Sequence, residues 1–238
     1  MGTEPQAAPE RAQTACDEPP VRVEDGGLVV DADFCLRFLR EVRDVAFATV
    51  DEEGLPAVRI IDVMMAEAGR LYFVAARGKA FYEQVMRTRY AAIVGQSPDF
   101  RTCRLRGPVE HPDDPAEQRR LVDRVFELNP SMDALYPGEA RYVLEAFYLE
   151  QGQGEYFDLG RSPLFRAPFS LGGGLVERDG FIVTSACTGC GACVAACPQG
   201  CIALQPDGRA LIAQEACLHC GRCREACHAN AVARRWRR

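Results

Sequence analysis

Eight of the twelve cysteines in this 238-residue chain fall in two short runs near its C-terminus. The runs are Cys187, Cys190, Cys193 and Cys197, then Cys217, Cys220, Cys223 and Cys227. Each has the spacing C-x2-C-x2-C-x3-C, which places three thiolates on one tight loop and the fourth at the start of a helix. Thiolates at this spacing typically bind [4Fe-4S] clusters, so we expect two such clusters.

The two runs form an internal repeat, because corresponding cysteines lie 30 positions apart. The flanks repeat as well, since 181–183 corresponds to 211–213 and 202–203 to 232–233. The segment therefore predicts two strand-loop-helix halves related by a pseudo-twofold axis. From about Gly180 to Val232 it resembles the bacterial two-[4Fe-4S] ferredoxin.

In two-cluster ferredoxins the fourth cysteine of each run ligates the other cluster. The expected ligand sets are therefore Cys187, Cys190, Cys193 with Cys227, and Cys217, Cys220, Cys223 with Cys197. A zinc ribbon would use four ligands in all and leave two cysteines per run unexplained. Disulfides would need an oxidising compartment, and we see no signal-peptide pattern. Iron-sulfur chemistry is thus favoured.

Two positions depart from a plain repeat. The first run ends Cys197-Pro198, but the second ends Cys227-His228. We expect His219 and His228 to be surface side chains, the alternative being a hydrogen bond that shifts a cluster's potential. Cys201 corresponds to Ala231 in the repeat, so we expect an ordinary buried strand cysteine.

Composition limits the class of protein. The chain is 47% hydrophobic with a formal net charge of −6, which argues against a nucleic-acid surface. No apolar run approaches the about 20 residues of a membrane helix, so we expect a soluble protein without membrane association. Because exposed clusters are oxygen-sensitive, we expect a reducing cytoplasm.

Composition shifts predict five parts. We expect a flexible N-terminal tail at 1–27, a barrel domain at 28–160, a linker at 161–179, the ferredoxin domain at 180–233 and a basic tail at 234–238. Cys16, in the N-terminal tail, is expected to be a free surface thiol.

Periodicity in the barrel domain predicts an α+β fold. Asp31 is a suitable N-cap for a helix over 32–43, which would contain Cys35. Alternating patterns then predict strands and amphipathic patterns predict helices. Expected strands are 45–50, 56–64, 70–75, 91–95, 101–110 and 147–159, and expected helices are 80–87, 115–128 and 138–146. The fold class is thus a six-stranded antiparallel split β-barrel with flanking helices, plus a small C-terminal ferredoxin domain of βαβ repeats.

Motifs on these elements resemble the pyridoxamine 5'-phosphate oxidase-like, FMN-binding split barrel over about Asp31 to Gly160. They are Val58-Arg59-Ile60-Ile61, Leu71-Tyr72-Phe73-Val74, Gly78-Lys79 before a helix, and Arg106-Gly107-Pro108-Val109-Glu110. The resemblance implies a homodimer with FMN at the subunit interface. It also implies that Arg59 and Lys79 meet the flavin phosphate, with Arg77 as a further candidate, and that the backbone of Ile60 and Ile61 runs beside the isoalloxazine.

Lys79 is the only lysine, against twenty-seven arginines. Arginine offers a bidentate fork to a phosphate and lysine a compact point charge. Two explanations stay open: a flexible ammonium is required at this position, or its survival is chance.

Departures from the oxidase limit the inference. The oxidase has a serine before its arginine-lysine pair, whereas this chain has Arg77-Gly78-Lys79. The oxidase also has a C-terminal substrate signature with arginine and tryptophan, whereas the single tryptophan of this chain, Trp236, lies in the tail. Pyridoxamine phosphate oxidation is therefore not expected. Cys103 is expected in the core and His111 at a strand end, and no side chain stands out as a catalytic acid or base.

The fused domains predict a flavin and iron-sulfur oxidoreductase. Electrons from a low-potential partner protein would pass between two [4Fe-4S] clusters and FMN and reduce a small organic substrate. One alternative is a dedicated electron carrier without a substrate of its own. Another is a barrel that binds haem or a deazaflavin. No G-x-G-x-x-G fingerprint precedes a helix, so an integral NAD(P)H domain is not expected.

Overall fold

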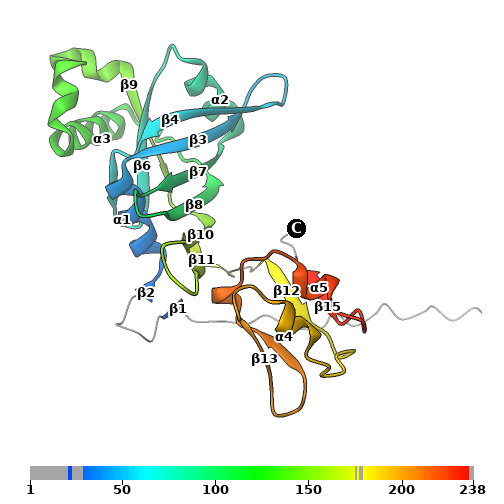
Figure 1. The fold of residues 1–238 in the computed structure, drawn as a ribbon. Helices are drawn as coiled ribbons and strands as arrows, with labels where there is room; N and C mark the ends of the chain where they lie inside the picture. Colours follow the sequence, from blue (N-terminus) through cyan, green and yellow to red (C-terminus); the bar gives the residue numbers. More distant parts are fainter. Residues whose placement is uncertain (1–20, 23–28, 175, 177–178, 236–238) are drawn as a thin grey trace, which may run out of the picture.

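The computed structural model describes residues 21–22, 29–174, 176 and 179–235, as a barrel with a smaller C-terminal unit beside it (Figure 1). Most of the expected N-terminal tail, with Cys16, and residues 236–238 of the basic tail lie outside the described residues. In the described part of the chain, no helix has the length and apolar character needed to cross a bilayer.

The barrel consists of two main antiparallel sheets with helices around them. Its elements are β1 (Val21–Arg22), β2 (Val29–Val30), α1 (Ala32–Val42), β3 (Asp44–Val50), β4 (Pro56–Asp62), β5 (Met65–Glu67), β6 (Arg70–Ala76), α2 (Ala80–Thr88), β7 (Tyr90–Gln96), β8 (Arg101–Pro108), α3 (Pro115–Leu128), the 3-10 helices η1 (Pro130–Ala134) and η2 (Gly138–Val143), β9 (Leu144–Leu149), β10 (Gly152–Asp158) and β11 (Phe165–Leu171). One sheet has the order β11-β10-β8-β7-β3-β4, the other has the order β5-β6-β9, and β1 pairs with β2. The α+β class and the split barrel are as predicted.

Local chemistry explains the first helix. The Asp31 carboxylate accepts the backbone N–H of Phe34 at 2.8 Å and caps α1 as expected. Cys35, Leu36 and Leu39 of this helix are buried in the barrel core together with Cys103. Cys35 is thus a helix residue and Cys103 a core residue, as expected.

The predicted elements over 138–159 need correction. The expected helix at 138–146 is the short 3-10 helix η2, and the expected strand at 147–159 is two strands, β9 and β10, in different sheets. The chain turns between them at Gly152, where φ is 157° and a Cβ would lie 2.5 Å from the Arg106 carbonyl oxygen. Only glycine suits that close approach, which is why the strand breaks there.

The segment expected as a linker also contains structure. Within 161–179, strand β11 pairs with β10 at the edge of the six-stranded sheet. Phe165, Ala167, Phe169 and Leu171 alternate inward and are buried. This period of two explains the strand, which the proline and glycine content of the segment concealed.

The C-terminal unit has the predicted repeat. Its elements are β12 (Gly180–Val183), α4 (Ala192–Ala196), β13 (Ile202–Leu204), β14 (Ala210–Ile212), the 3-10 helix η3 (Gln214–Ala216), α5 (Arg222–Glu225) and β15 (Val232–Arg235). β12 pairs with β15 and β13 with β14. Gly191 and Gly221, at equivalent positions, begin the two helices with φ of 73° and 85°. The unit is ferredoxin-like, as predicted.

Candidate functional site

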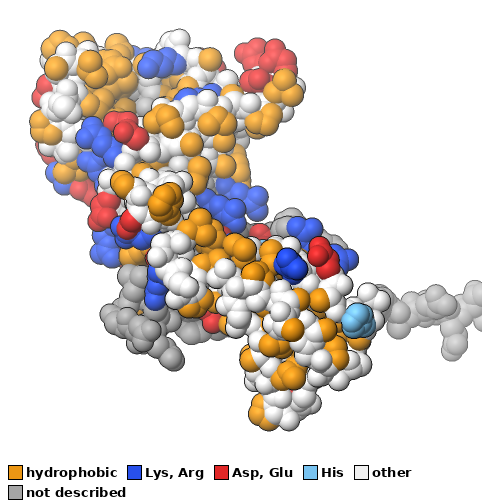
Figure 2. Space-filling model, viewed as in Figure 1, with side chains coloured by type: hydrophobic (Ala, Val, Ile, Leu, Met, Phe, Trp, Pro, Cys, Tyr) orange, Lys and Arg blue, Asp and Glu red, His pale blue; other side chains and the backbone are white. Residues whose placement is uncertain are grey.

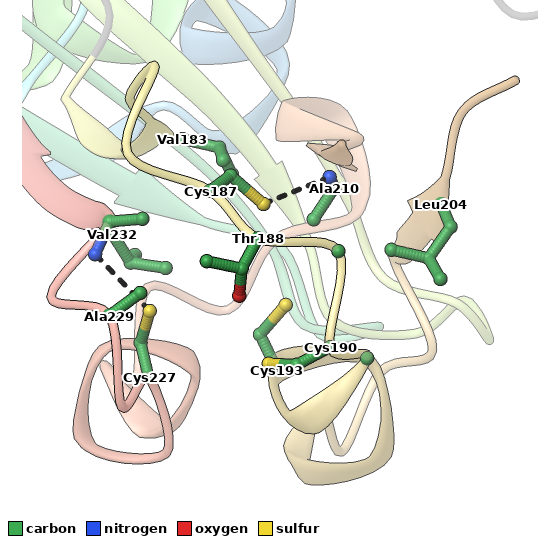
Figure 3. A pocket seen from close by; sticks show the side chains of 13 residues that line it. Val183, Cys187, Thr188, Cys190, Cys193, Leu204, Ala210, Cys227, Ala229 and Val232 are labelled. Atoms are coloured by element: carbon green, nitrogen blue, oxygen red, sulfur yellow. Dashed lines mark hydrogen bonds between the residues drawn. The ribbon is translucent and has the colours of Figure 1, made fainter. Parts of the chain in front are cut away.

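Two cysteine-lined cavities lie at opposite ends of the pseudo-twofold repeat. The first is lined by Cys187, Cys190, Cys193 and Cys227, with apolar walls that include Val183, Leu204 and Val232 (Figure 3). The second is lined by Cys217, Cys220, Cys223 and Cys197, with Phe181 and Ile202 among its walls. The structure thus brings together the same two sets of thiols that the spacing predicts. A fifth thiol, Cys201, also lines the second cavity.

Backbone N–H groups point at the sulfur atoms. Ala210 N lies 3.5 Å from Cys187 Sγ, Ala231 N lies 3.2 Å from Cys227 Sγ, and His219 N lies 3.4 Å from Cys217 Sγ. The N–H groups of Ala210 and Gly189 lower the pKa of Cys187, whereas burial raises the pKa of Cys223 to about 11. Thiols in an apolar pocket with amide donors to their sulfurs fit a [4Fe-4S] cluster well.

The second cysteine loop contacts the barrel through His219. Arg166 on β11 donates to His219 Nδ1 at 2.9 Å and pairs with Glu155 on β10 at 3.1 Å. Burial, followed by the charge of Arg166, lowers the pKa of His219 to about 4, which keeps the ring neutral. The expectation of a surface side chain is therefore wrong for His219, although His228 is exposed.

The backbone of His219 adopts a conformation that is unfavourable for a residue with a side chain. Its φ is 58°, and the equivalent residue of the first half is Gly189, with φ of 70°. A non-glycine residue with positive φ is uncommon. In the sequence, the feature that marks His219 is therefore that it stands where the first half of the repeat has a glycine.

The candidate flavin residues lie around α2. Arg59 on β4 points inward, donates to Gln84 Oε1 at 2.7 Å and to the Thr49 hydroxyl, and lies over the Phe81 ring at 4.9 Å. Burial lowers the pKa of Arg59. Lys79 occupies the N-cap position of α2, but its side chain makes no capping hydrogen bond. An arginine, an exposed lysine and uncapped helical N–H groups suit a phosphate, so these residues fit FMN.

Arg77, the further candidate for the phosphate, contacts a different set of residues. Its guanidinium donates to Glu145 Oε1 at 2.9 Å and to the Tyr142 carbonyl at 2.9 Å. Glu145 also accepts from the Tyr82 hydroxyl at 2.6 Å and lies 2.7 Å from His111 Nε2. Sequence patterns carry no signal for this cluster of Arg77, Tyr82, His111 and Glu145, because its members come from four separate segments.

One face of the six-stranded sheet is apolar at one end and charged at the other. Ile60 on β4, Ala46 on β3, Val94 on β7, Arg104 on β8 and Glu155 on β10 are in register across it. We call its exposed part on β3, β4 and β7 the apolar face, with Val50, Val58, Ile60, Tyr90 and Val94 at its surface. Val58 and Ile60 are 65% and 63% exposed. Apolar side chains are visible along β3 and β4 in Figure 2.

The two candidate sites lie at opposite edges of this sheet. β4, with Arg59 and Ile60, is one edge strand, and β11, with Arg166, is the other. Five inter-strand steps at about 4.8 Å each separate them by about 24 Å along the sheet. Figure 1 shows the C-terminal unit beside β11 and far from β4.

Comparisons with known proteins identify two segments. Residues 32–140 match the family described as pyridoxamine 5'-phosphate oxidase, and residues 186–231 match the 4Fe-4S dicluster domain. No curated protein matches the chain.

Several solved structures are similar to the barrel. A NimC/NimA family protein from Clostridium acetobutylicum is 25% identical, with 57% of this chain and 89% of that chain covered and a TM-score of 0.48. A pyridoxamine 5'-phosphate oxidase-related, FMN-binding protein from Nostoc punctiforme is 20% identical, with 57% and 84% covered and a TM-score of 0.38. A heme-binding protein from Mycobacterium smegmatis is 13% identical, with 58% of each chain covered and a TM-score of 0.46.

Proposed function

Since the chain carries a domain of the pyridoxamine 5'-phosphate oxidase family and a 4Fe-4S dicluster domain, we propose that it is an FMN-dependent iron-sulfur oxidoreductase. Electrons pass between two [4Fe-4S] clusters and FMN and reduce a small organic substrate. When bound, the clusters supply single electrons and the flavin exchanges one or two. A low-potential electron-transfer protein is the expected partner.

The arrangement of the eight thiols carries this proposal. Two sets of four, each drawn from both halves of the repeat, line two separate cavities in one small unit. We assign Cys187, Cys190, Cys193 and Cys227 to the first cluster, and Cys217, Cys220, Cys223 and Cys197 to the second. The Arg166–His219 contact holds the second site against the barrel.

The flavin assignment rests on the residues around α2. Arg59 and Lys79 meet the phosphate at the N-terminus of α2, and the exposed edge strand β4 offers the backbone of Ile60 and Ile61 to the ring. Arg77 is held by Glu145, so we assign it to the support of this region rather than to the phosphate.

The apolar face supports a homodimer. Monomeric proteins rarely expose several large apolar side chains side by side, so we propose that a second copy covers this face. The C-terminal unit contacts β11 at the far end of the same face, where Arg166 lies between His219 and the buried Glu155 of β10. A partner on the apolar face therefore lies next to the C-terminal unit. We propose that each flavin site exchanges electrons with the clusters of the partner.

Mixed dimers test this function. One chain carries Lys79→Ala and the other carries Cys187→Ala with Cys217→Ala, each with its own affinity tag. The mixed dimer then has flavin on one chain and clusters on the other. After anaerobic reduction with dithionite we expect the clusters to bleach first and the flavin to follow in stopped-flow absorbance. The extracted cofactor is identified by mass.

Two results would contradict the proposal. Flavin that is reduced in the parent protein but not in the mixed dimer would exclude transfer between subunits. A haem or deazaflavin in the extract would remove the FMN assignment, and flavin occupancy unchanged by Lys79→Ala would remove the assignment of Lys79 to the flavin site.

A further inference from the structure

The two cluster sites differ by one thiol. Cys201 is 8% exposed and lines the second cavity, and its Sγ lies 3.5 Å from Cys197 Sγ. The equivalent residue, Ala231, lines the first cavity and is 1% exposed. Cys201 is buried as expected, but it is not an ordinary strand cysteine, because it lies beside the four candidate ligands of the second site.

The backbone around this position is the same in both halves. Ala231 N donates to Cys227 Sγ at 3.2 Å, and the backbone N–H of Cys201 likewise donates to Cys197. At this position the two sites therefore differ only in the side chain, which carries S–H in the second and is a methyl group in the first. A buried thiol in apolar surroundings stays protonated and remains a donor.

Charged pairs lie near both sites. The Arg166 guanidinium contacts His219, two residues from Cys217, but it is also paired with Glu155 at 3.1 Å. Near Cys187 the charges, Arg209 and Asp207, likewise have opposite signs. The charges therefore do not distinguish the two sites, and the Cys201 thiol does. Hydrogen bonds to cluster sulfurs and nearby positive charge stabilise the more negative, reduced form of a cluster.

We propose that the Cys201 thiol donates a hydrogen bond to Cys197 Sγ and thereby makes the second cluster the one with the higher reduction potential. The thiol keeps its proton, no bond to iron forms, and the cluster takes up one electron. An electron that enters at the first site then moves to the second, which is the site docked on the barrel. This inference rests on the proposed function, because it assumes both clusters.

A redox titration tests the inference. The purified anaerobic holoprotein is titrated with mediators and followed by electron paramagnetic resonance, and we expect two one-electron steps. Cys201→Ala should shift the upper step to lower potential and leave the lower step in place. Cys201→Ser retains a donor and should stay near the wild-type value. Ala231→Ser gives the first site a donor and should raise the lower step.

Iron and acid-labile sulfide per chain should be the same in all variants. Loss of a cluster in Cys201→Ala would show that Cys201 is a ligand and overturn the proposal. Two unchanged steps, or a shift of the lower step only, would overturn it as well. The two steps are read from the cluster signals and not from the flavin radical, so protein without flavin would contradict the proposed function and leave this test intact.

Discussion

Glu145 holds together side chains from three other segments beside the N-terminal end of α2. Its carboxylate accepts from Tyr82 and Arg77 and contacts His111, and its side chain is 16% exposed. Burial acts to raise the pKa of Glu145, but the hydrogen bonds from Tyr82, Arg77 and His111 outweigh it and lower the pKa. The fold thus favours the ionised carboxylate.

This sign sets a pH dependence. Stability from Glu145 is fully present above 4.5, its ordinary pKa, and is lost as the pH falls through the lower folded value. We expect Glu145→Gln to lower the free energy of unfolding by about 1–3 kcal/mol at pH 7, and the gap to wild type to narrow below pH 4.5. Urea unfolding followed by circular dichroism measures both.

Glu139→Gln is the matched control for this prediction. Glu139 pairs with Arg119, but its side chain is 85% exposed. Loss of the Glu139 charge should change the free energy of unfolding by less than about 0.5 kcal/mol, both at pH 7 and below pH 4.5. A gap for Glu145→Gln that is constant from pH 7 to pH 4 would show that its charge does not contribute.

At the scale of elements, β4 is both the edge that carries Arg59 and part of the apolar face. Its residues alternate, so Arg59 points toward α2 while Val58 and Ile60 point outward. One strand therefore serves the flavin site with one side and the proposed dimer with the other.

We expect Ile60→Glu to weaken self-association at least about tenfold, because an unpaired carboxylate in an apolar contact is costly. Sedimentation equilibrium of the anaerobic protein measures the dissociation constant. Leu135→Glu is the control, since Leu135 is 74% exposed and lies outside the apolar face. Equal dissociation constants for wild type and Ile60→Glu would rule out this face as the interface.

Elements with strong local signals were predictable from sequence. The Asp31 cap gave the start of α1, the Pro115–Leu128 helix has the bounds its pattern predicts, and the 30-residue repeat gave the C-terminal unit and the grouping of its thiols. β11 was missed because proline and glycine surround its alternating residues. The Glu145 cluster and the Arg166–His219 contact were missed because they join segments far apart in sequence, for which periodicity has no signal.

At the scale of the whole molecule, a small polar cluster joins the two units. Arg166 is 13% exposed, lies between Glu155 and His219, and stacks on Phe157 at 4.6 Å. Gln214 of η3 donates to the Phe181 carbonyl at 2.9 Å, which orders the cluster unit next to this contact. This guanidinium, together with the hydrogen bond from Leu164 N–H to Gln199 Oε1 at 3.5 Å, therefore connects the second cluster site to the barrel.

We expect Arg166→Gln to loosen this docking, since a charged hydrogen bond is worth about 1.5–3 kcal/mol and Glu155 also loses a partner. Small-angle scattering of the anaerobic holoprotein should show a larger radius of gyration, and amides of η3 should exchange faster. His219→Gly should do the same, although it relieves the positive φ of 58°. Arg104→Gln is the control, because Arg104 pairs with Glu155 but is 56% exposed. If both Arg166→Gln and His219→Gly keep the wild-type radius and exchange rates while iron content stays full, the docking depends on apolar contacts and not on Arg166.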